Sequence, residues 1–341
     1  MKFDFCIGNP PYQDETVGDQ KQFAPPVYDK FMEAAFEVSN AVELIHPARF
    51  LFNAGGTAKE WNQKMLEDSH FKVLFHEQDS SKVFANTDIK GGVVVTYRNA
   101  NKEFGAIGTY TPFPMLNEIL IVVKRHEGNR PFSDIISNRG LYKFSSLMYE
   151  EQSAEMEKMT DSRVGASSFE RMPKIFTEEK PNDGHDYAEF LGLFKTKRVY
   201  RWFRIDYFNL VRSFDKYKVM FPAANGSGQF GETLSMPVLG NKRIGHTETF
   251  ISIGCFDTID EANACFKYIC TKFCRSMLGI LKITQHCSPE KWKYVPLQDF
   301  TPQSDIDWTK SIREIDQQLY AKYKLSPDEI DFIETHVKEM E

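Results

Sequence analysis

The pattern of hydrophobic and polar positions divides the first hundred residues into short segments with different periods. An apolar run ending in glycine predicts a buried strand at 3–8, and apolar side chains at helical spacing predict a helix at 27–39. Similar runs predict a strand at 42–46, a helix at 57–68, and two strands at 71–76 and 92–97, which we expect to pair antiparallel. This order of elements is typical of an α/β fold.

Beyond about residue 125 the pattern is mixed. Aromatic-rich runs predict strands near 200–222 and at 249–254, and a long apolar stretch predicts a helix at 258–281. A final helical pattern runs over 307–339, with a break near Ser326-Pro327. We therefore expect three parts: an α/β half-domain at 1–125, a second α/β region at 126–300 and a helical tail at 301–341.

The segment Asn9-Pro10-Pro11-Tyr12 directly follows the first predicted strand and carries specific chemistry. An exocyclic ring amine is a poor nucleophile because its lone pair is delocalised. Two acceptors, the Asn9 side-chain carbonyl and the Pro10 backbone carbonyl, can hold its two hydrogens and free that lone pair. The two prolines make the loop rigid, and Tyr12 offers a ring on which an extruded base can stack.

The chain resembles the adenine-specific DNA methyltransferases, above all the methylase part of type IIG-like restriction-modification enzymes. The resemblance begins with FDFCIGNPPYQ and VYDKFMEAAF, and continues with VELIHPARFLFNAG and SSKVFANTDIKGGVVVTYRN. It implies that Phe84 packs on the second side of the target adenine, opposite Tyr12. The long segment from ISIGCFDTIDEANACFKY to KWKYVPLQDF, with LYAKYKLS after it, resembles the target-recognition region of these enzymes.

Composition and charge indicate where in the cell the protein is expected and which part of the chain can be basic. Hydrophobic residues make up 41% of the chain and charged residues 26%, as in ordinary soluble proteins. Six cysteines without a secretory signal indicate a reducing compartment, and no apolar run reaches the ~20 residues of a membrane span, so we expect a cytoplasmic protein. The net charge of −6 equals the excess of eleven acids over five bases from Gln298 onward. The body before this tail can therefore hold basic patches.

Double-stranded DNA is the partner that the resemblance implies, and two basic stretches, 195–218 and 267–293, suit phosphate contacts. In both, the alternative is a solvated polar face. Gln285 could also read a base edge, since Gln commonly pairs with adenine. The expected DNA-binding residues are Lys197, Arg198, Arg201, Arg204, Lys272, Arg275, Lys282, Gln285 and His286.

The resemblance also implies S-adenosylmethionine as cofactor, but its site is expected to be incomplete. In the family's usual order the cofactor motif precedes Asn-Pro-Pro-Tyr, and only eight residues precede Asn9. The pattern Gly226-x-Gly228-x-x-Gly231 follows a plausible strand, yet Pro237 and Gly240 interrupt the helix that a cofactor turn requires. A loop of the recognition region is the better interpretation, and the cofactor-binding residues stay unassigned.

No metal site is expected. Cys265, Cys270 and Cys274 lie in one apolar helix with His286 and Cys287 nearby, but this spacing matches no common zinc pattern. Apolar helices often bury cysteine as a small hydrophobe.

The sequence thus predicts a partial Rossmann-like methyltransferase sheet, an α/β target-recognition region and an acidic helical tail. The function expected is that of a component of a DNA adenine methyltransferase, incomplete alone, with a separate polypeptide supplying the cofactor half or a homodimer covering the exposed sheet edge. The alternative is a catalytically silent DNA-binding specificity module. A protein or RNA methyltransferase fits less well, because a long region follows the half-domain.

Overall fold

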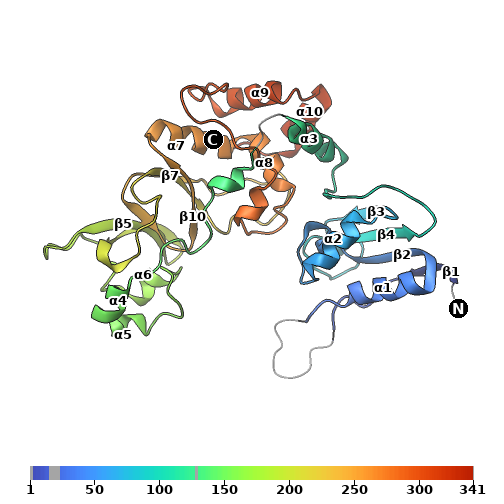
Figure 1. Ribbon diagram of the computed structural model, residues 1–341, viewed down its shortest axis with the longest axis horizontal. Coiled ribbons are helices and arrows are strands. Elements are labelled where there is room, and N and C mark those ends of the chain that lie inside the picture. The colour runs from blue at the N-terminus through green and yellow to red at the C-terminus, as the bar shows by residue number, and fades with distance from the viewer. Residues whose placement is uncertain (1–2, 15–23, 127–129, 341) are drawn as a thin grey trace. The chain divides into compact units, whose positions relative to one another are not determined.

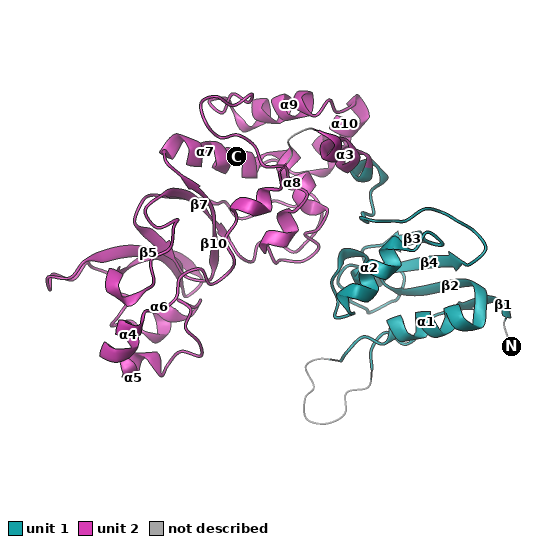
Figure 2. Cartoon of the chain, viewed as in Figure 1, with its two compact units in different colours: residues 1–117 teal, residues 118–341 magenta. Residues whose placement is uncertain are grey.

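A computed structural model describes residues 3–14, 24–126 and 130–340. The described residues form a mixed α/β structure with ten α-helices and three sheets. They separate into two compact units, residues 1–117 and 118–341, coloured separately in Figure 2. The division falls inside helix α3 (Pro114–Arg125).

Unit 1 contains a four-stranded sheet in the order β1-β2-β4-β3 (Figure 1). Strands β1 and β2 pair in parallel, whereas β4 pairs antiparallel with both β2 and β3. The predicted strands and the antiparallel closing pair are therefore confirmed. Their bounds are β1 Phe3–Gly8, β2 Ser39–Pro47, β3 Phe71–Glu77 and β4 Val93–Asn99.

Helices α1 (Tyr28–Val38) and α2 (Lys59–Glu67) confirm the two helices predicted for this unit. Both pack on the same face of the sheet. The Tyr28 ring of α1 stacks on His46 of β2 with centroids 5.6 Å apart, and Trp61 of α2 meets Tyr28 edge-on at 6.3 Å. This side of the sheet is therefore a closed aromatic core.

Strand β1 departs from the prediction, because it is exposed rather than buried. Phe3, Phe5 and Ile7 keep 57%, 49% and 72% of their surface accessible. They alternate along β1, so they share one face, and β1 lies at the edge of the sheet. None of the described helices of unit 1 packs over these three side chains, which explains the exposure. The apolar run correctly indicated a strand but not whether anything covers it.

Unit 2 holds two three-stranded sheets in the orders β10-β7-β8 and β6-β5-β9 (Figure 1). Strands β5 and β6 form a long antiparallel hairpin, and β9 adds to β5 in parallel. The strands expected near 200–222 are β6 and β7, separated by a loop. Their bounds are β5 Tyr187–Phe194, β6 Lys197–Arg204, β7 Tyr217–Pro222, β8 Val238–Gly240, β9 Ile244–His246 and β10 Phe250–Phe256.

The helix expected at 258–281 is two helices, α7 (Ile259–Cys270) and α8 (Lys272–Gly279). The chain is extended at Thr271 (φ −62°, ψ 149°), whose hydroxyl accepts the Cys274 backbone N–H and caps α8. The buried carboxylate of Asp316 accepts the next two free N–H groups, at Lys272 and Phe273, both at 2.9 Å. These contacts stabilise the start of a new helix.

The tail is helical over α9 (Ile312–Lys322) and α10 (Pro327–His336), with the break at Ser326-Pro327 as predicted. Residues 307–311, expected to be helical, instead lead into a capping box at Ser311. The remaining helices are short: α4 Ser146–Glu151, α5 Ser153–Met156, α6 Ser168–Arg171, and the 3-10 turns η1 Ala48–Phe52, η2 Ser80–Lys82, η3 Phe132–Ile135, η4 Ile205–Tyr207 and η5 Pro289–Trp292.

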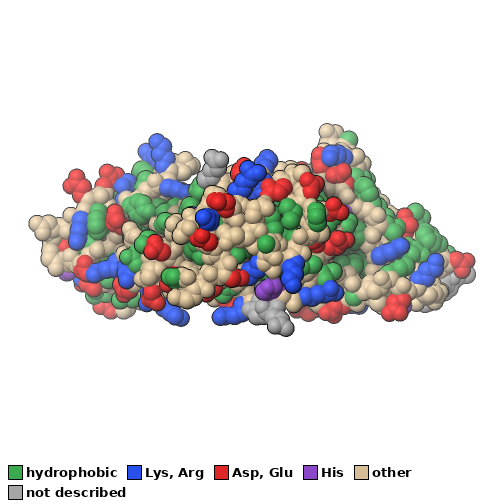
Figure 3. Space-filling view, turned by 90° about the horizontal axis from the view of Figure 1, so that it is seen from above, with side chains coloured by type: hydrophobic (Ala, Val, Ile, Leu, Met, Phe, Trp, Pro, Cys, Tyr) green, Lys and Arg blue, Asp and Glu red, His purple; other side chains and the backbone are tan. Residues whose placement is uncertain are grey.

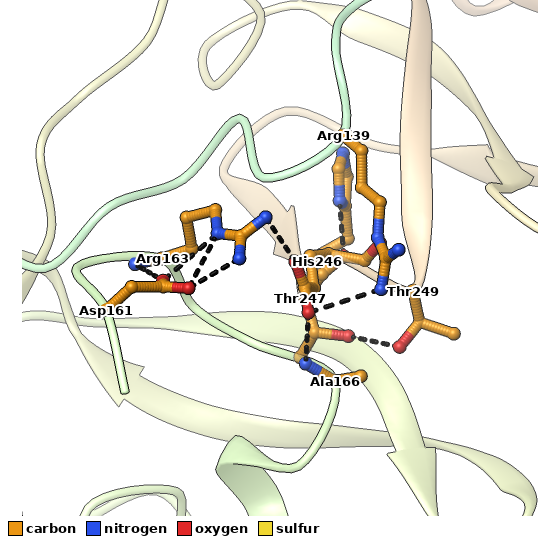
Figure 4. A network of polar contacts seen from close by, with 8 residues as sticks. Arg139, Asp161, Arg163, Ala166, His246, Thr247 and Thr249 are labelled. Atoms are coloured by element: carbon orange, nitrogen blue, oxygen red, sulfur yellow. Dashed lines mark hydrogen bonds and ion pairs between the residues drawn. The ribbon is translucent and has the colours of Figure 1, made fainter. Parts of the chain in front are cut away.

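Glu248, between β9 and β10, ties loops of unit 2 together (Figure 4). Its carboxylate pairs with Arg139 at 3.3 Å and with Arg163 at 3.1 Å, and accepts the Ala166 backbone N–H. The neighbouring His246 is buried between the Thr247 carbonyl and the Ser252 hydroxyl. Burial lowers the pKa of His246 to about 4, so the ring is neutral at physiological pH. This network therefore has a structural role, because it holds the loops at Arg139, Arg163 and Ala166 to Glu248.

Candidate functional site

Asn9-Pro10-Pro11-Tyr12 leaves the sheet of unit 1 where the first parallel strand ends. Because β1 and β2 run in parallel, their carboxyl ends lie at one edge of the sheet, where ligands of α/β sheets usually bind. Asn9 and Pro11 are exposed, while Pro10 and Tyr12 are half-buried. The Tyr12 carbonyl accepts the Val27 N–H at 3.2 Å, which anchors the loop to the residue before α1.

The loop with Phe84 reaches the same edge. Strand β3 ends there and β4 starts there, because Glu77 and Pro47 both pair with Val93. Ser80 fixes the loop: its hydroxyl accepts the Ile89 N–H at 2.8 Å, and its carbonyl accepts the Phe84 N–H at 2.8 Å. Sheet topology therefore brings two segments some seventy positions apart in the chain to one place.

The backbone at Gly92, where the Phe84 loop joins β4, lies very close to the backbone of Glu77. Gly92 has φ +79°, and a Cβ there would lie 2.1 Å from the Glu77 carbonyl oxygen. Only glycine fits this position without displacing backbone.

The Tyr12 and Phe84 rings are neighbours, with centroids 6.4 Å apart and planes inclined by 65°. A flat base between two parallel rings needs about 7 Å, twice the ~3.5 Å contact distance between carbon atoms. The separation thus nearly matches, but one ring must turn to admit a base. Without a base, the rings contact each other edge to face, an arrangement that aromatic pairs favour.

The Tyr12 hydroxyl lies buried with no hydrogen-bond partner among the described residues. Burial raises the pKa of Tyr12, so the phenol stays protonated. Beneath the edge, burial also lowers the pKa of His46 to about 4, and its Nε2 lies 2.8 Å from the Thr96 hydroxyl. The acceptors offered by Asn9 and Pro10 are themselves neutral.

The glycine-rich segment from Gly226 to Gly231 is folded around an internal carboxylate. Glu232 accepts the backbone N–H groups of Ser227 at 2.7 Å and Gly228 at 2.8 Å, and it pairs with the buried Lys282 at 2.9 Å. A Cβ at Gly231 would lie 1.9 Å from the His336 carbonyl oxygen. The glycines therefore allow close packing against the protein's own backbone, and the segment does not fit a cofactor.

Four of the expected DNA-binding residues lie on β6. Lys197 and Arg198 are exposed, and Arg198 donates to the Met236 carbonyl at 2.8 Å. Arg201 and Arg204 are only 13% and 11% exposed and are paired with Glu178 and with Glu151 and Asp206. The exposed cations are therefore those near the turn of the hairpin.

Three of the other expected residues do not lie where a phosphate could reach them easily. Arg275 is 4% exposed and donates to backbone carbonyls, including Cys270 and Glu232. Lys282 is 5% exposed and paired with Glu232, and Lys272 pairs with Glu334 at 2.6 Å. Arg275 and Lys282 therefore do not fit the expected role as DNA contacts, because both are buried in unit 2, and the ammonium of the half-buried Lys272 is already paired.

Gln285 and His286 are exposed and lie in the segment after α8. Their backbone is held to the residues after β7, since the Asn225 N–H donates to the Gln285 carbonyl at 2.7 Å. Both side chains are thus presented on a fixed backbone. On the face shown in Figure 3, basic and acidic side chains are interspersed.

Cys265, Cys270, Cys274 and Cys287 are buried, and burial raises the pKa of each thiol. Among the described residues no group of three or more His, Cys, Asp or Glu side chains could hold a metal ion. Within the same parts of the chain, no helix is long and apolar enough to cross a membrane.

Two residues that hold these segments in place, Ser80 and Glu232, could not be recognised from the sequence. Serine at 80 was one of several small polar residues in a loop, and Glu232 was one acid among many. Only the spatial arrangement identifies them, because their partners are backbone N–H groups or lie far along the chain.

The family comparison concerns unit 1. Residues 1–84 match the model of the family described as Eco57I restriction-modification methylase. An uncharacterised adenine-specific methylase of Mycoplasma pneumoniae is 30% identical over 95 residues, which are 27% of this chain and 22% of that protein. The chain therefore spans about a fifth of this curated relative.

Two solved structures are similar over most of the chain but only weakly. The type IIG restriction endonuclease BpuSI gives a TM-score of 0.37 at 8% identity, over 93% of this chain and 48% of that one. The type IIL restriction-modification enzyme MmeI, solved in complex with DNA, gives 0.40 at 10% identity, over 98% and 56%. The resemblance predicted from the sequence is confirmed by the family match, since residues 1–84, which include Asn9-Pro10-Pro11-Tyr12 and Phe84, are similar to the Eco57I restriction-modification methylase family.

Proposed function

We propose that the chain is the target-base component of a DNA adenine methyltransferase of a restriction-modification system. The observation that carries the proposal is the meeting of Asn9-Pro10-Pro11-Tyr12 and Phe84 at one edge of the unit 1 sheet, within the segment that matches the methylase family. The substrate would be the exocyclic amine of an adenine extruded from duplex DNA.

In this proposal the Asn9 side-chain carbonyl and the Pro10 carbonyl accept the two amine hydrogens. Both are neutral acceptors on an exposed, proline-stiffened loop, so they can be in place before the base arrives. With both hydrogens held, the nitrogen becomes tetrahedral and its lone pair points out of the ring plane. The amine is then prepared to attack a methyl group.

The Tyr12 and Phe84 rings would hold the base from its two sides. Their separation of 6.4 Å is close to what a sandwiched base requires, and a rotation of either ring would open the gap. Stacking of this kind typically contributes about 1–3 kcal/mol per base. It compensates for part of the cost of taking the adenine out of the duplex.

S-adenosylmethionine is the methyl donor of this type of enzyme, and we propose that the chain does not hold it alone. The one glycine-rich candidate, Gly226 to Gly231, is filled by Glu232 and packed against backbone. In this proposal the described residues therefore act on the adenine, and not on the methyl donor.

An uncovered sheet in unit 1 supports the need for a partner. Strands in parallel pairs are normally covered on both faces, yet Phe3, Phe5 and Ile7 are exposed at the free edge of β1. A separate α/β polypeptide carrying the cofactor site could add a strand beside β1 and cover this face. A homodimer formed through the same edge is the second arrangement that would do so.

We further propose a partial Rossmann-like catalytic half-domain at 1–125, a target-recognition region at 126–300 and an acidic helical tail at 301–341. A cytoplasmic location and double-stranded DNA as the partner go with this function. The competing function is a DNA-binding specificity module without catalysis. It would explain the exposed Lys197 and Arg198, but it gives no reason for the pairing of Tyr12 with Phe84.

Two experiments test the function. Isothermal titration of the folded chain with S-adenosylmethionine should show no binding, whereas clear micromolar binding would contradict the half-site proposal. In a host without adenine methylation, the gene should yield N6-methyladenine only together with a gene for the partner, and N9A should abolish it. Absence of methylation with every neighbouring gene tested would favour the silent module.

A further inference from the structure

A cavity of about 390 Å³ lies in unit 2, between the segment after η3, the loop after η4 and the last part of β10. This volume is within the range of about 300–1,000 Å³ that sites for small molecules usually have. All residues that line it belong to unit 2, and the target-base site of unit 1 shares none of them. The cavity is therefore a second candidate site.

Hydrogen bonds within the protein hold two walls of this cavity. The Ser137 N–H donates to the Ser252 carbonyl and the Ser252 N–H donates to the Ser137 hydroxyl, both at 2.8 Å. In the loop after η4, the Ser213 carbonyl accepts from the buried ammonium of Lys218 at 2.9 Å. Because these contacts need no ligand, the walls are in place before one binds, and little ordering entropy is lost on binding.

A β-bulge brings Cys255 into the wall of the cavity. The pairing of β10 with β7 shifts register between Ile253 and Phe256. Gly254 lies in this bulge with φ +79°, and a Cβ there would lie 2.1 Å from a carbon of the Phe256 ring. Bulges redirect side chains, and here the exposed Cys255 becomes part of the cavity lining.

Apolar side chains supply much of the remaining lining. Ile136, Leu141, Val211 and Phe256 are half-buried there. Leu141 and Val211 also pack against the hydrophobic core of unit 2, so the apolar surface of the cavity continues into that core. A ligand with an apolar body would remove this surface from water, which favours binding.

The polar groups of the lining indicate the charge of the ligand. Of the described residues that line the cavity, two are charged, Asp134 and Arg212. Asp134 is paired with Arg130 at 3.2 Å, whereas the exposed Arg212 guanidinium makes no ion pair or hydrogen bond with a described residue. An unpaired guanidinium presents a planar pair of donors that matches a carboxylate.

A buried hydroxyl adds a second polar group. Ser213 is 6% exposed and lines the cavity, and its hydroxyl has no hydrogen-bond partner among the described residues. The Tyr142 hydroxyl lacks a partner as well. Burial raises the pKa of Tyr142 and the nearby Ser213 hydroxyl lowers it, so the two groups are close but not in hydrogen-bond geometry. After a rotation about the Ser213 Cα–Cβ bond, a ligand oxygen can accept the hydroxyl hydrogen.

We infer that this cavity binds a small carboxylate with an apolar body, such as an aryl carboxylate. The carboxylate pairs with Arg212 and accepts from the Ser213 hydroxyl, and the apolar body lies against Leu141, Val211 and Phe256. The inference is independent of the proposed function, because none of these residues belongs to the target-base site and no DNA is involved.

The test uses alkylation of Cys255 by iodoacetamide in the full chain as a reporter of the site. The reagent is neutral, so Arg212 does not steer it, and peptide mass spectrometry measures the rate at Cys255 separately from the other cysteines. 2-Naphthoate should slow this reaction with a half-maximal effect at about 1 mM, as expected for a weak ligand of this size. 2-Naphthamide has the same rings without the charge, and its effect should be about 5-fold weaker or more.

Two variants separate the role of Arg212 from a general effect of charge. R212Q should remove the difference between 2-naphthoate and 2-naphthamide, whereas R313Q, which removes an exposed guanidinium outside the cavity lining, should keep it. In each variant the four buried cysteines should stay unmodified, which shows that unit 2 is folded. The inference would be overturned by no slowing with 2-naphthoate up to its solubility limit, by equal slowing with both compounds in the wild type, or by an unchanged difference in R212Q.

Discussion

Removing the buried ammonium of Lys282 should destabilise unit 2 strongly. Lys282 is 5% exposed and its only ion-pair partner among the described residues is Glu232, at 2.9 Å. In K282M the methionine fills the space, but the Glu232 carboxylate, whose side chain is 16% exposed, loses its counter-charge. Breaking a buried pair from one side typically costs about 3–5 kcal/mol.

The expected cost lies at or just below the lower end of that range, because Glu232 keeps other donors. It still accepts from the Ser227 N–H, the Ser227 hydroxyl and the Gly228 N–H, at 2.7 to 2.8 Å. We therefore expect about 2–3 kcal/mol for K282M. E232A should cost more, since it leaves a buried ammonium and two backbone N–H groups unpaired.

Urea unfolding followed by tryptophan fluorescence measures the effect, because Trp292 of unit 2 is fully buried. With a slope of about 2–3 kcal/mol per molar urea, K282M should lower the midpoint of that transition by about 1 M. E232Q/K282M should lose about 2 kcal/mol less than the sum of the single variants. An unchanged midpoint in K282M would refute the view that this ion pair holds the glycine-rich segment.

The stabilisation contributed by the Glu232 carboxylate should also depend on pH. Burial alone would raise the pKa of Glu232, but the hydrogen bonds from Ser227, Lys282 and Gly228 outweigh it and lower the pKa below its usual value of 4.5. A depressed folded pKa means that the stabilisation is present above pH 4.5 and is lost as the pH falls through the folded value. The difference between wild type and K282M should therefore shrink in acid.

Three further predictions concern two buried histidines, one threonine and one glycine. Burial holds the pKa of His46 and of His246 near 4, below the unfolded value of 6.5. Acidification from pH 6.5 to 4 should therefore destabilise each unit by up to about 3 kcal/mol. Urea unfolding at several pH values should show a weaker pH dependence of stability in H46Q and in H246Q. T196G should relieve the left-handed backbone conformation of Thr196 (φ 69°) and stabilise unit 2 by about 0.5–1 kcal/mol, seen as a higher melting temperature; a lower one would contradict strain at this residue. G92A should destabilise unit 1 by about 1–3 kcal/mol in the same assay, because its Cβ meets the Glu77 carbonyl; a neutral effect would show that the loop can shift.

The sequence predicted unit 1 well because its signals are local. Hydrophobic periodicity located strands β1 to β4 and helices α1 and α2, though not α3, and Asn9-Pro10-Pro11-Tyr12 marked a strand end. It did not reveal that Phe3, Phe5 and Ile7 are exposed. Alternating apolar residues show that a strand has an apolar face, but covering that face depends on elements elsewhere.

Unit 2 was harder to predict from the sequence, because its buried charged side chains interact with residues far away along the chain. Lys282 finds Glu232 fifty positions away, and Arg275 donates to the Lys338 carbonyl sixty-three positions away. A count of basic residues in a segment cannot separate such interior groups from exposed ones like Lys197. The break at Thr271 is similar, since Asp316 of α9 supplies the N–H acceptors that stabilise it.

The target-base site itself can be tested without a cofactor, a partner or a known recognition sequence. A base opposite an abasic site is already unpaired, so it can be presented extrahelically at low cost. The most direct measurement compares the affinity of the chain for duplexes carrying adenine or unsubstituted purine opposite an abasic site. Purine lacks the exocyclic amine, so only adenine can donate to Asn9 and Pro10.

Two hydrogen bonds of about 0.5–1.5 kcal/mol each predict that adenine binds roughly 5-fold to 150-fold more tightly than purine. N9A should remove about half of this preference in free energy, and F84A should weaken both duplexes alike through lost stacking. That result would establish Asn9 as an acceptor for the target amine. Equal affinity of the wild-type chain for adenine and purine would contradict the account.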